Sequence, residues 1–309
     1  MLGFIARRLL LLVPTVFGVV TLVFFFIHMI PGDPVEAMLG ETAQAADKAV
    51  LREQLGLDKP LAEQYAGFLL GVARADLGQS FFYHDGVFKV IARRLPNTVR
   101  LALVALLISL FIAIPAGIFA ALRKGTVFDN AAMLGSLVGV AMPNFWLGPL
   151  LIILFALKLE WLPVAGNEAR FSIVLPALTL GLGLAAILSR MTRSSVLEVL
   201  SEDYVLTARA KGLPERTVIL KHVLRNALMP VITIVGLQAG GLLSGAIITE
   251  TVFAWPGIGS LLVNAIQARD YPLVQGCVLV ISVSYVIVNL AADLAYALVD
   301  PRIRLEGRS

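Results

Sequence analysis

Residues 208–230 read ARAKGLPERTVILKHVLRNALMP and separate two long apolar runs of the chain. Basic side chains recur through this stretch, and a Gly-Leu-Pro sequence at 212–214 interrupts it. Glycine commonly follows the last turn of a helix, and proline is accepted in the first turn of the next one. We therefore predict that a helix continues from the preceding apolar run and ends at Gly212, and that a second helix runs from Pro214 to about Arg225.

This basic segment is longer than a simple connection between two helices requires, which is about five residues. Two interpretations remain open. A basic helix can lie on the surface of an anionic membrane. A short helix that carries Leu220, Val223 and Leu224 beside basic residues can instead be covered by a cytoplasmic protein.

Composition places the chain in a membrane. Of its 309 residues, 58% are hydrophobic and 15% are charged, which is too apolar for a soluble domain. Six runs nearly free of charge are long enough to cross about 30 Å of hydrocarbon as helices, so we predict an all-α polytopic membrane protein. The six predicted spans are Leu9–Ile30, Thr98–Leu122, Asn130–Leu157, Ile173–Leu197, Leu228–Ile248 and Tyr271–Val299.

Basic residues indicate the orientation of these spans. If the N-terminus is cytoplasmic and the spans alternate, 14 of the 25 Lys and Arg residues lie inside, and three lie in the short outer loops 158–172 and 249–270. Cytoplasmic loops carry such an excess of basic residues, so we predict that both termini are cytoplasmic. Arg93 and Arg94 lie outside on this scheme and are exceptions. The net charge of +4 therefore reflects orientation and does not indicate nucleic-acid binding.

Two parts of the chain follow from this layout. Residues 1–97 hold the first span and a hydrophilic segment outside the membrane, and residues 98–309 hold five spans with the basic segment at about 198–227. The hydrophilic segment can cover helix ends as a lid or can offer a docking surface to an external partner.

Two amphipathic helices are predicted within the hydrophilic segment. The first runs from about Ala45 to Leu55, and the second is capped by Asp58 and has Pro60 in its first turn. The apolar residues that the second helix is expected to bury are Leu61, Tyr65, Phe68 and Leu69.

Residues 249–272, TETVFAWPGIGSLLVNAIQARDYP, join the last two spans. Trp255 is of a type that anchors at membrane interfaces, and Pro-Gly sequences break the chain. A re-entrant or interfacial segment is indicated rather than a solvated loop, and backbone of that kind at membrane depth is buried in protein or lines a cavity. Glycines in the span before it permit close helix packing, and a pore-lining face is the alternative. We hypothesise a translocation path near Gly240, Gly241, Ser244 and Glu250, with an outer gate from Phe253 to Gly259 that includes Pro256 and Gly257.

Signatures of enzymes are missing from the sequence. No phosphate-binding GxxxxGK[ST] motif is present, and the three histidines are too dispersed for a metal-ligand cluster. The single cysteine, Cys277, offers no disulfide. Glu250 and Asp293 are the notable carboxylates in or near the spans, whereas ion-coupled carriers usually need more ionisable groups at mid-membrane. A self-sufficient secondary transporter or channel and an intramembrane enzyme are the competing classes.

The segment EDYVLTARAKGLPERTVILKHVLRNALMP at 202–230 resembles the EAA loop of ABC-importer permeases of the dipeptide, oligopeptide, glutathione and nickel branch. Thr207 stands where the general motif has its first alanine, and Ala208 matches the second. The likeness extends over nearly the whole chain and is strongest to B-type subunits of dipeptide permeases. Loop 158–172 is short in this chain, whereas some of those subunits carry a long insertion there. Further matching segments are RRLLLLVPT (7–15), HMIPGDPV (28–35), LGLDKPL (55–61), DLGQS (76–80), RMTRSSVLEVLSEDY (190–204), GLQAGGLLSGAIITETVFAWPGIG (236–259), RDYPLVQ (269–275) and DLAYALVDPRIR (293–304).

This resemblance implies a non-catalytic permease subunit with the type I importer fold in the inner membrane of a bacterium. It implies a homologous second permease chain, two cytoplasmic ATPase chains that bind ATP and magnesium, and an extracytoplasmic solute-binding protein, with no cofactor in this chain. Dipeptides are the expected substrate, with oligopeptides, glutathione and nickel as alternatives. Residues 212–222 are then expected to sit in a groove of one ATPase. The coupling residues implied are Ala208, Arg209, Lys211, Gly212, Leu213, Pro214, Arg216, Ile219 and His222.

Overall fold

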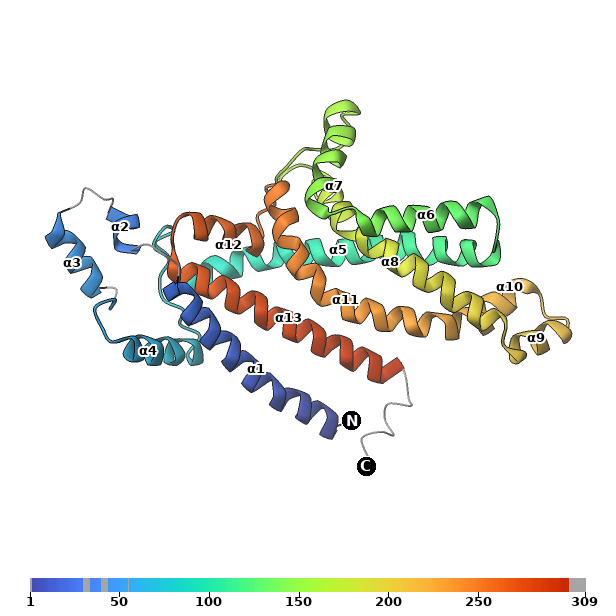
Figure 1. Cartoon of the computed structure of the whole chain (residues 1–309), viewed down its shortest axis with the longest axis horizontal. Helices are drawn as coiled ribbons and strands as arrows, with labels where there is room; N and C mark the ends of the chain where they lie inside the picture. Colours follow the sequence, from blue (N-terminus) through green and yellow to red (C-terminus); the bar gives the residue numbers. More distant parts are fainter. Residues whose placement is uncertain (1, 30–33, 40–43, 55, 300–309) are drawn as a thin grey trace. The chain divides into compact units, whose positions relative to one another are not determined.

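The computed structural model describes the chain except residues 1, 30–33, 40–43, 55 and 300–309 (Figure 1). The described part is helical and contains no β-strand beyond one isolated bridge between Gln79 and Gly86. The helices are α1 (Leu2–Met29), α2 (Pro34–Leu39), α3 (Ala45–Gln54), α4 (Leu61–Ala73), α5 (Val87–Leu122), α6 (Val127–Ala141), α7 (Asn144–Leu151), α8 (Val174–Leu200), α9 (Asp203–Ala210), α10 (Glu215–Thr217), α11 (Leu224–Val252), α12 (Ile258–Gln267) and α13 (Tyr271–Val299), with π-helical turns η1 (Ile152–Lys158) and η2 (Val218–Val223).

Four helices of the described chain are long and apolar enough to cross a membrane, or five if a bent pair is one span. The bent pair is α6 with α7–η1, and the helix direction changes by 109° between them, within the predicted third span. Pro143 explains the bend, because it lacks an N–H and disfavours helical backbone at Met142, which is extended. In α1 the apolar stretch Val13–Phe25 is shorter, so the count of six spans stays a prediction.

The chain forms two compact units that do not follow a single cut in the sequence. Unit 1 contains residues 99–255 and the chain from 287 onward, and unit 2 contains residues 2–98 and 256–286. The boundary predicted between residues 97 and 98 stays a prediction.

Helix α8 forms the centre of unit 1, where it packs against α6 and α11. It also lies close to α5, because a Cβ added at Gly181 would come within 2.6 Å of the Ala105 carbonyl oxygen. Small residues permit such close approach between apolar helices. The core around this crossing includes Leu101, Leu188 and Trp255. Trp255 is 1% exposed, so the predicted interfacial anchor is in fact a core residue.

In unit 2, α4 packs on α1 through aromatic and hydroxyl side chains. The Phe24 and Phe68 rings stack with centroids 5.8 Å apart, and the hydroxyls of Thr21 and Tyr65 are 2.7 Å apart. The predicted cap of the second amphipathic helix was wrong. Pro60, not Asp58, occupies the N-cap position of α4 and offers no capping side chain.

Helix α4 also buries less of its apolar surface than the sequence predicted. Leu61 remains 46% exposed, whereas Tyr65, Phe68 and Leu69 are half-buried. The helix therefore covers α1 with one face and leaves its first turn open.

Candidate functional site

The basic segment folds differently from its prediction at its beginning. The helix from the fourth span was expected to continue to Gly212, but α8 ends at Leu200 and a separate helix, α9, follows after Ser201 and Glu202. Ser201 donates its hydroxyl to the Glu198 carbonyl at 2.6 Å. Serine side chains compete in this way with the helical backbone pattern, which accounts for the break.

The end of α9 at Gly212 is confirmed. Gly212 has a φ of +76°, which only glycine adopts at little cost. Its N–H donates to the Arg209 carbonyl at 2.9 Å, and the Leu213 N–H donates to the Ala208 carbonyl at 3.4 Å. These two bonds form a Schellman motif and satisfy carbonyls at the C-terminus of α9.

After this turn the chain enters the fifth span directly. Pro214 occupies the N-cap position of α10, and α10, η2 and α11 continue to Val252. The prediction of a separate helix from Pro214 to about Arg225 is therefore wrong, because these residues form the first turns of the fifth span. The isolated short helix in this segment is α9.

The predicted coupling residues separate into buried and exposed members. Ala208 is 5% exposed and packs with Val205, Val218 and Val223 inside unit 1. Ile219 and His222 are half-buried. The exposed members are Arg209, Lys211, Gly212, Leu213, Pro214 and Arg216.

Arg209 is engaged within the chain. Its Nη2 donates to Glu215 Oε1 at 2.6 Å and its Nε donates to Glu215 Oε2 at 3.2 Å. This hydrogen bonding raises the pKa of Arg209 above its ordinary value, and the bidentate pair ties α9 to α10 across the Gly212 turn. Arg209 therefore shapes the turn rather than offering an unpaired charge.

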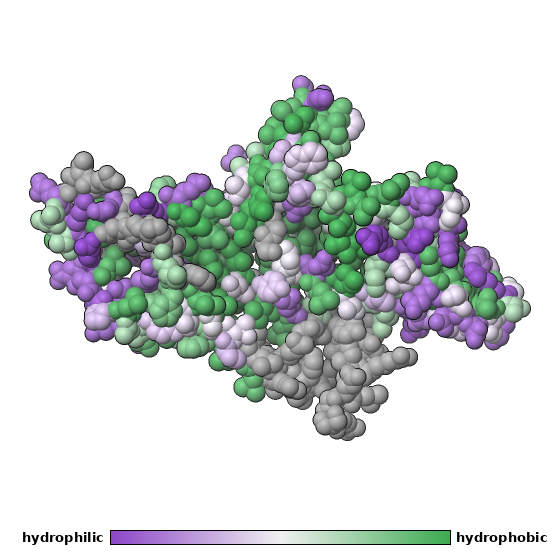
Figure 2. Space-filling view, in the orientation of Figure 1, coloured by the Kyte–Doolittle hydropathy of each residue, from purple (hydrophilic) through white to green (hydrophobic). Residues whose placement is uncertain are grey.

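Two exposed apolar side chains near this turn were not predicted: Tyr204 is 39% exposed and Leu206 is 53% exposed. Leu220, which the sequence offered as an apolar residue of this segment, is 55% exposed. The spacing of Leu206 and Leu213 across a glycine turn gave no periodic signal in the sequence. This end of unit 1 mixes hydrophobic and hydrophilic side chains (Figure 2). We call the following exposed residues the coupling surface: Tyr204, Leu206, Lys211, Leu213, Pro214, Arg216 and Leu220.

The residues predicted near a translocation path also separate. Gly241 is exposed, and an added Cβ there would meet no atom within 4 Å. Leu237 and Ile248 are 69% and 46% exposed. Their spacing places all three on one face of α11. Gly240 is buried, and the Ser244 side chain lies outside the described residues.

Glu250 and Phe253 are 0% and 1% exposed, so they do not lie on a surface of this chain. The chain turns sharply beside them. Trp255 donates its N–H to the Glu250 carbonyl at 2.8 Å, and Gly166 donates its N–H to the Phe253 carbonyl at 2.9 Å. These two residues hold the end of α11 in place within unit 1.

In unit 2, the Pro-Gly break is held by two residues that the sequence analysis missed. Asn97 Nδ2 donates to the Pro256 carbonyl at 2.8 Å, and Thr98 Oγ1 accepts from the Ile258 N–H at 2.8 Å. Pro256 is half-buried and Gly257 is buried. Both bonds join residues about 160 positions apart in sequence, so no local pattern could reveal them.

Comparison with known proteins decides the family. A family model described as "Binding-protein-dependent transport system inner membrane component" matches residues 113–305, and the model of the corresponding N-terminal region matches residues 1–102. This chain belongs to that family. Family members of this kind are permease components, and the present permease chain shows the several apolar helices that they require.

Two curated permeases illustrate the range of relatives. The permease is 45% identical to the "Di/tripeptide transport system permease protein DppB" of Pseudomonas aeruginosa (strain UCBPP-PA14), over 98% of this chain and 99% of the relative. It is 43% identical to the "Glutathione transport system permease protein GsiC" of Escherichia coli (strain K12), again over 98% of this chain and 99% of the relative.

A solved structure supports the fold. It is titled "Inward facing conformations of the MetNI methionine ABC transporter", and its matched chain has a TM-score of 0.57 and 16% identity, over 68% of this permease and 96% of that chain. At this identity the likeness concerns the fold alone, which is that of type I ABC importer permeases.

Bulk added at Gly241 is expected to lower transport without disturbing the fold. The open space around Gly241 admits the tryptophan of Gly241→Trp, whereas an added Cβ at Gly236 would lie 3.0 Å from the Ala292 Cβ. Gly236→Trp is the comparison that should reduce the amount of folded permease. Uptake per assembled complex and membrane abundance are measured for both variants. Full uptake by Gly241→Trp would remove this face of α11 from the path.

Proposed function

We propose that this permease forms half of the translocation path of an ATP-driven importer of short peptides, with dipeptides as the first substrate class. The single observation that carries this proposal is the 45% identity to a di/tripeptide permease over nearly the full length of both chains. The alignment covers 98% of this chain, so it includes both the path region and the coupling surface.

The orientation proposed for the permease places both termini and the coupling surface in the cytoplasm of the cell, with the chain in the inner membrane. The excess of basic residues around 190–225 supports it, because such residues favour the cytoplasmic side. Two cytoplasmic ATPase chains bind and hydrolyse ATP with magnesium, one of them against the coupling surface. The permease itself holds no catalytic group for that reaction.

The remaining partners follow from the same proposal. A homologous second permease faces this side of α11, where Leu237, Gly241 and Ile248 are left uncovered by this chain, and completes the translocation path beside them. A solute-binding protein delivers the peptide on the extracytoplasmic side. Nucleic acid has no part in this assembly.

Glutathione is the second candidate substrate, and one observation favours it. The alignment to the glutathione permease spans 304 positions, fewer than the 309 residues of this chain. The alignment to the di/tripeptide permease spans 333 positions, so that relative carries residues that this chain lacks. Loop 158–172 is the part of this chain that is shorter than in some dipeptide permease subunits.

Reconstitution tests the proposal and separates the substrates. The permease is co-expressed with its candidate partner chains in a strain without other peptide importers, and uptake of a labelled dipeptide, a tripeptide and glutathione is compared. We expect ATP-dependent dipeptide uptake that ends when the ATPase chains carry an inactivating substitution. Uptake of glutathione alone would assign that substrate, and uptake that persists without ATP hydrolysis would contradict an ABC importer.

A further inference from the structure

The loop between α4 and α5, residues 78–86, has a conformation fixed by its own hydrogen bonds. An antiparallel bridge closes its base. Inside it, Ser80 donates its N–H to the Asp85 carbonyl at 2.9 Å, and Ser80 Oγ accepts from the Tyr83 N–H at 3.0 Å. We call this segment the aromatic loop, because Phe81, Phe82 and Tyr83 form its tip.

A buried carboxylate attaches the aromatic loop to the turn before α13. Asp270 is 0% exposed and accepts hydrogen bonds from Ser80 Oγ, from the Phe82 N–H at 3.1 Å and from the Leu273 N–H at 3.2 Å. The backbone of Phe82 is therefore held in place, yet its side chain is 65% exposed. A rigidly presented aromatic side chain loses little conformational entropy when a partner covers it.

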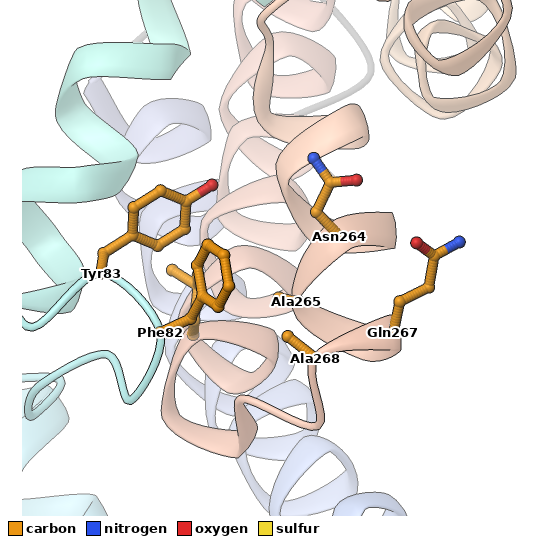
Figure 3. Close-up of a pocket in the computed structure, with 7 residues that line it drawn as sticks. Phe82, Tyr83, Asn264, Ala265, Gln267 and Ala268 are labelled. Carbon is orange, nitrogen blue, oxygen red and sulfur yellow. The ribbon is translucent and has the colours of Figure 1, made fainter. Parts of the chain in front are cut away.

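A pocket of about 380 Å³ lies between this loop and α12. Figure 3 shows the rings of Phe82 and Tyr83 on one side of it and the side chains of Asn264 and Gln267 on the other. Ala265, Ala268 and Leu273 complete the lining, which contains no charged side chain. The pocket thus combines an apolar wall with amide groups that can donate and accept hydrogen bonds.

Basic side chains lie beside one acidic residue of the aromatic loop. Lys89 and Arg93 are 61% and 63% exposed and lie 3.1 Å and 3.4 Å from Asp85, which belongs to the loop. Hydrogen bonding from Lys89 lowers the pKa of Asp85, so this acid stays ionised beside the two cations. Arg269, next to the lining residue Ala268, is exposed as well. Set against the carboxylates of Asp85 and the buried Asp270, these three cations leave a net positive charge beside the loop, which favours an acidic partner.

We propose that this pocket receives an apolar side chain carried on an acid-flanked loop of the extracytoplasmic solute-binding protein. This inference rests on the proposed function and specifies where one partner docks. The amides of Asn264 and Gln267 suit the backbone of such a loop, and the wall of Phe82 suits its side chain. A free peptide fits this pocket less well, because it brings two charged termini to a lining without charged groups. A lipid chain also fits less well, because it offers no hydrogen bond to either amide.

Phe82→Ala tests the pocket, and Phe88→Ala is its matched control. Phe88 is 57% exposed on α5, close to the exposure of Phe82, but it does not line the pocket. The assembled complex is placed in lipid nanodiscs, and its affinity for the solute-binding protein that restores uptake in the assay above is measured. We expect Phe82→Ala to weaken binding about tenfold or more, as loss of a central aromatic anchor does, and Phe88→Ala to leave it unchanged.

Stimulation of ATP hydrolysis by the solute-binding protein is measured for the unmodified complex and tests the proposed function independently. If this stimulation is absent, the proposed function fails, and the result does not bear on the pocket. Wild-type affinity in Phe82→Ala, or equal losses in both variants, would overturn the pocket assignment. A photoreactive phenylalanine at position 82 gives a second readout that does not require removal of the aromatic ring. It should crosslink to the purified solute-binding protein, whereas crosslinking to lipid or to labelled dipeptide alone would assign the pocket to those ligands and overturn the proposal.

Discussion

Arg193→Met is expected to lower the melting temperature of the purified complex by roughly 5–10 °C, because it leaves a buried carboxylate without its partner. Asp129 in α6 is 2% exposed and accepts from two nitrogens of Arg193 in α8, with the Nη2 to Oδ2 distance at 2.8 Å. The Gly125 N–H also donates to Asp129 Oδ2 at 2.9 Å, but this neutral donor cannot replace the guanidinium.

A double variant makes this expectation specific. Replacing both members of a buried ion pair by apolar residues is often neutral. Asp129 is buried and Arg193 is half-buried, so Arg193→Met with Asp129→Leu should recover much of the lost stability. Arg190→Met is the matched control, because Arg190 is exposed on the same helix. Thermal melting monitored by fluorescence-detected gel filtration measures all three. Equal losses in Arg193→Met and Arg190→Met, or no recovery in the double variant, would contradict a stabilising ion pair.

Of the helix ends that depend on one residue, the sequence predicted the one at Gly212. Gly212 ends α9 with a positive φ, and glycine is the residue that favours such backbone at a helix C-terminus. Ser201 ends α8 by a side-chain bond to Glu198, but serine occurs within helices too often for the break to be predicted. Pro143 bends the third span, which hydropathy alone represents as one continuous run.

Most structural features that could not be predicted from the sequence depend on contacts between residues far apart in the chain. Asp270 and Ser80 are 190 positions apart, and the bond between them joins the aromatic loop to the turn before α13. Glu250 was predicted near the path and Phe253 in the outer gate, from the glycine-rich run and the Pro-Gly break after it, yet their burial depends on how α11 packs in unit 1. The interaction of Arg209 with Glu215 crosses a turn that hydropathy does not describe.

The Gly212 turn offers the sharpest test of the coupling surface. Gly212→Val is expected to uncouple ATP hydrolysis from uptake, because a β-branched residue at a φ of +76° is strained by about 1–3 kcal/mol. No atom lies within 4 Å of an added Cβ, so the effect is a change of backbone and not a steric clash. Gly212→Asn is the matched control, because asparagine tolerates left-handed backbone and should retain most of the coupling.

Leu213→Asp tests the surface that this turn presents. Leu213 is 38% exposed, so the substitution leaves the fold intact but places a charge where an ATPase chain would bury an apolar contact. We expect the ATPase chains to dissociate from this variant during purification, while membrane abundance stays unchanged. Arg216→Glu and Lys221→Glu should weaken retention less, because rim charges contribute less than a buried anchor.

A helix that rests on anionic lipid predicts the opposite ranking. Arg216→Glu and Lys221→Glu would then have the larger effects, and Leu213→Asp would change ATPase retention little. Co-purification of the ATPase chains, normalised to the amount of permease, ranks the variants directly. If the ATPases stay bound and coupled in both Gly212→Val and Leu213→Asp, the coupling surface does not hold them. In that case the basic residues of this segment only orient the permease in the membrane.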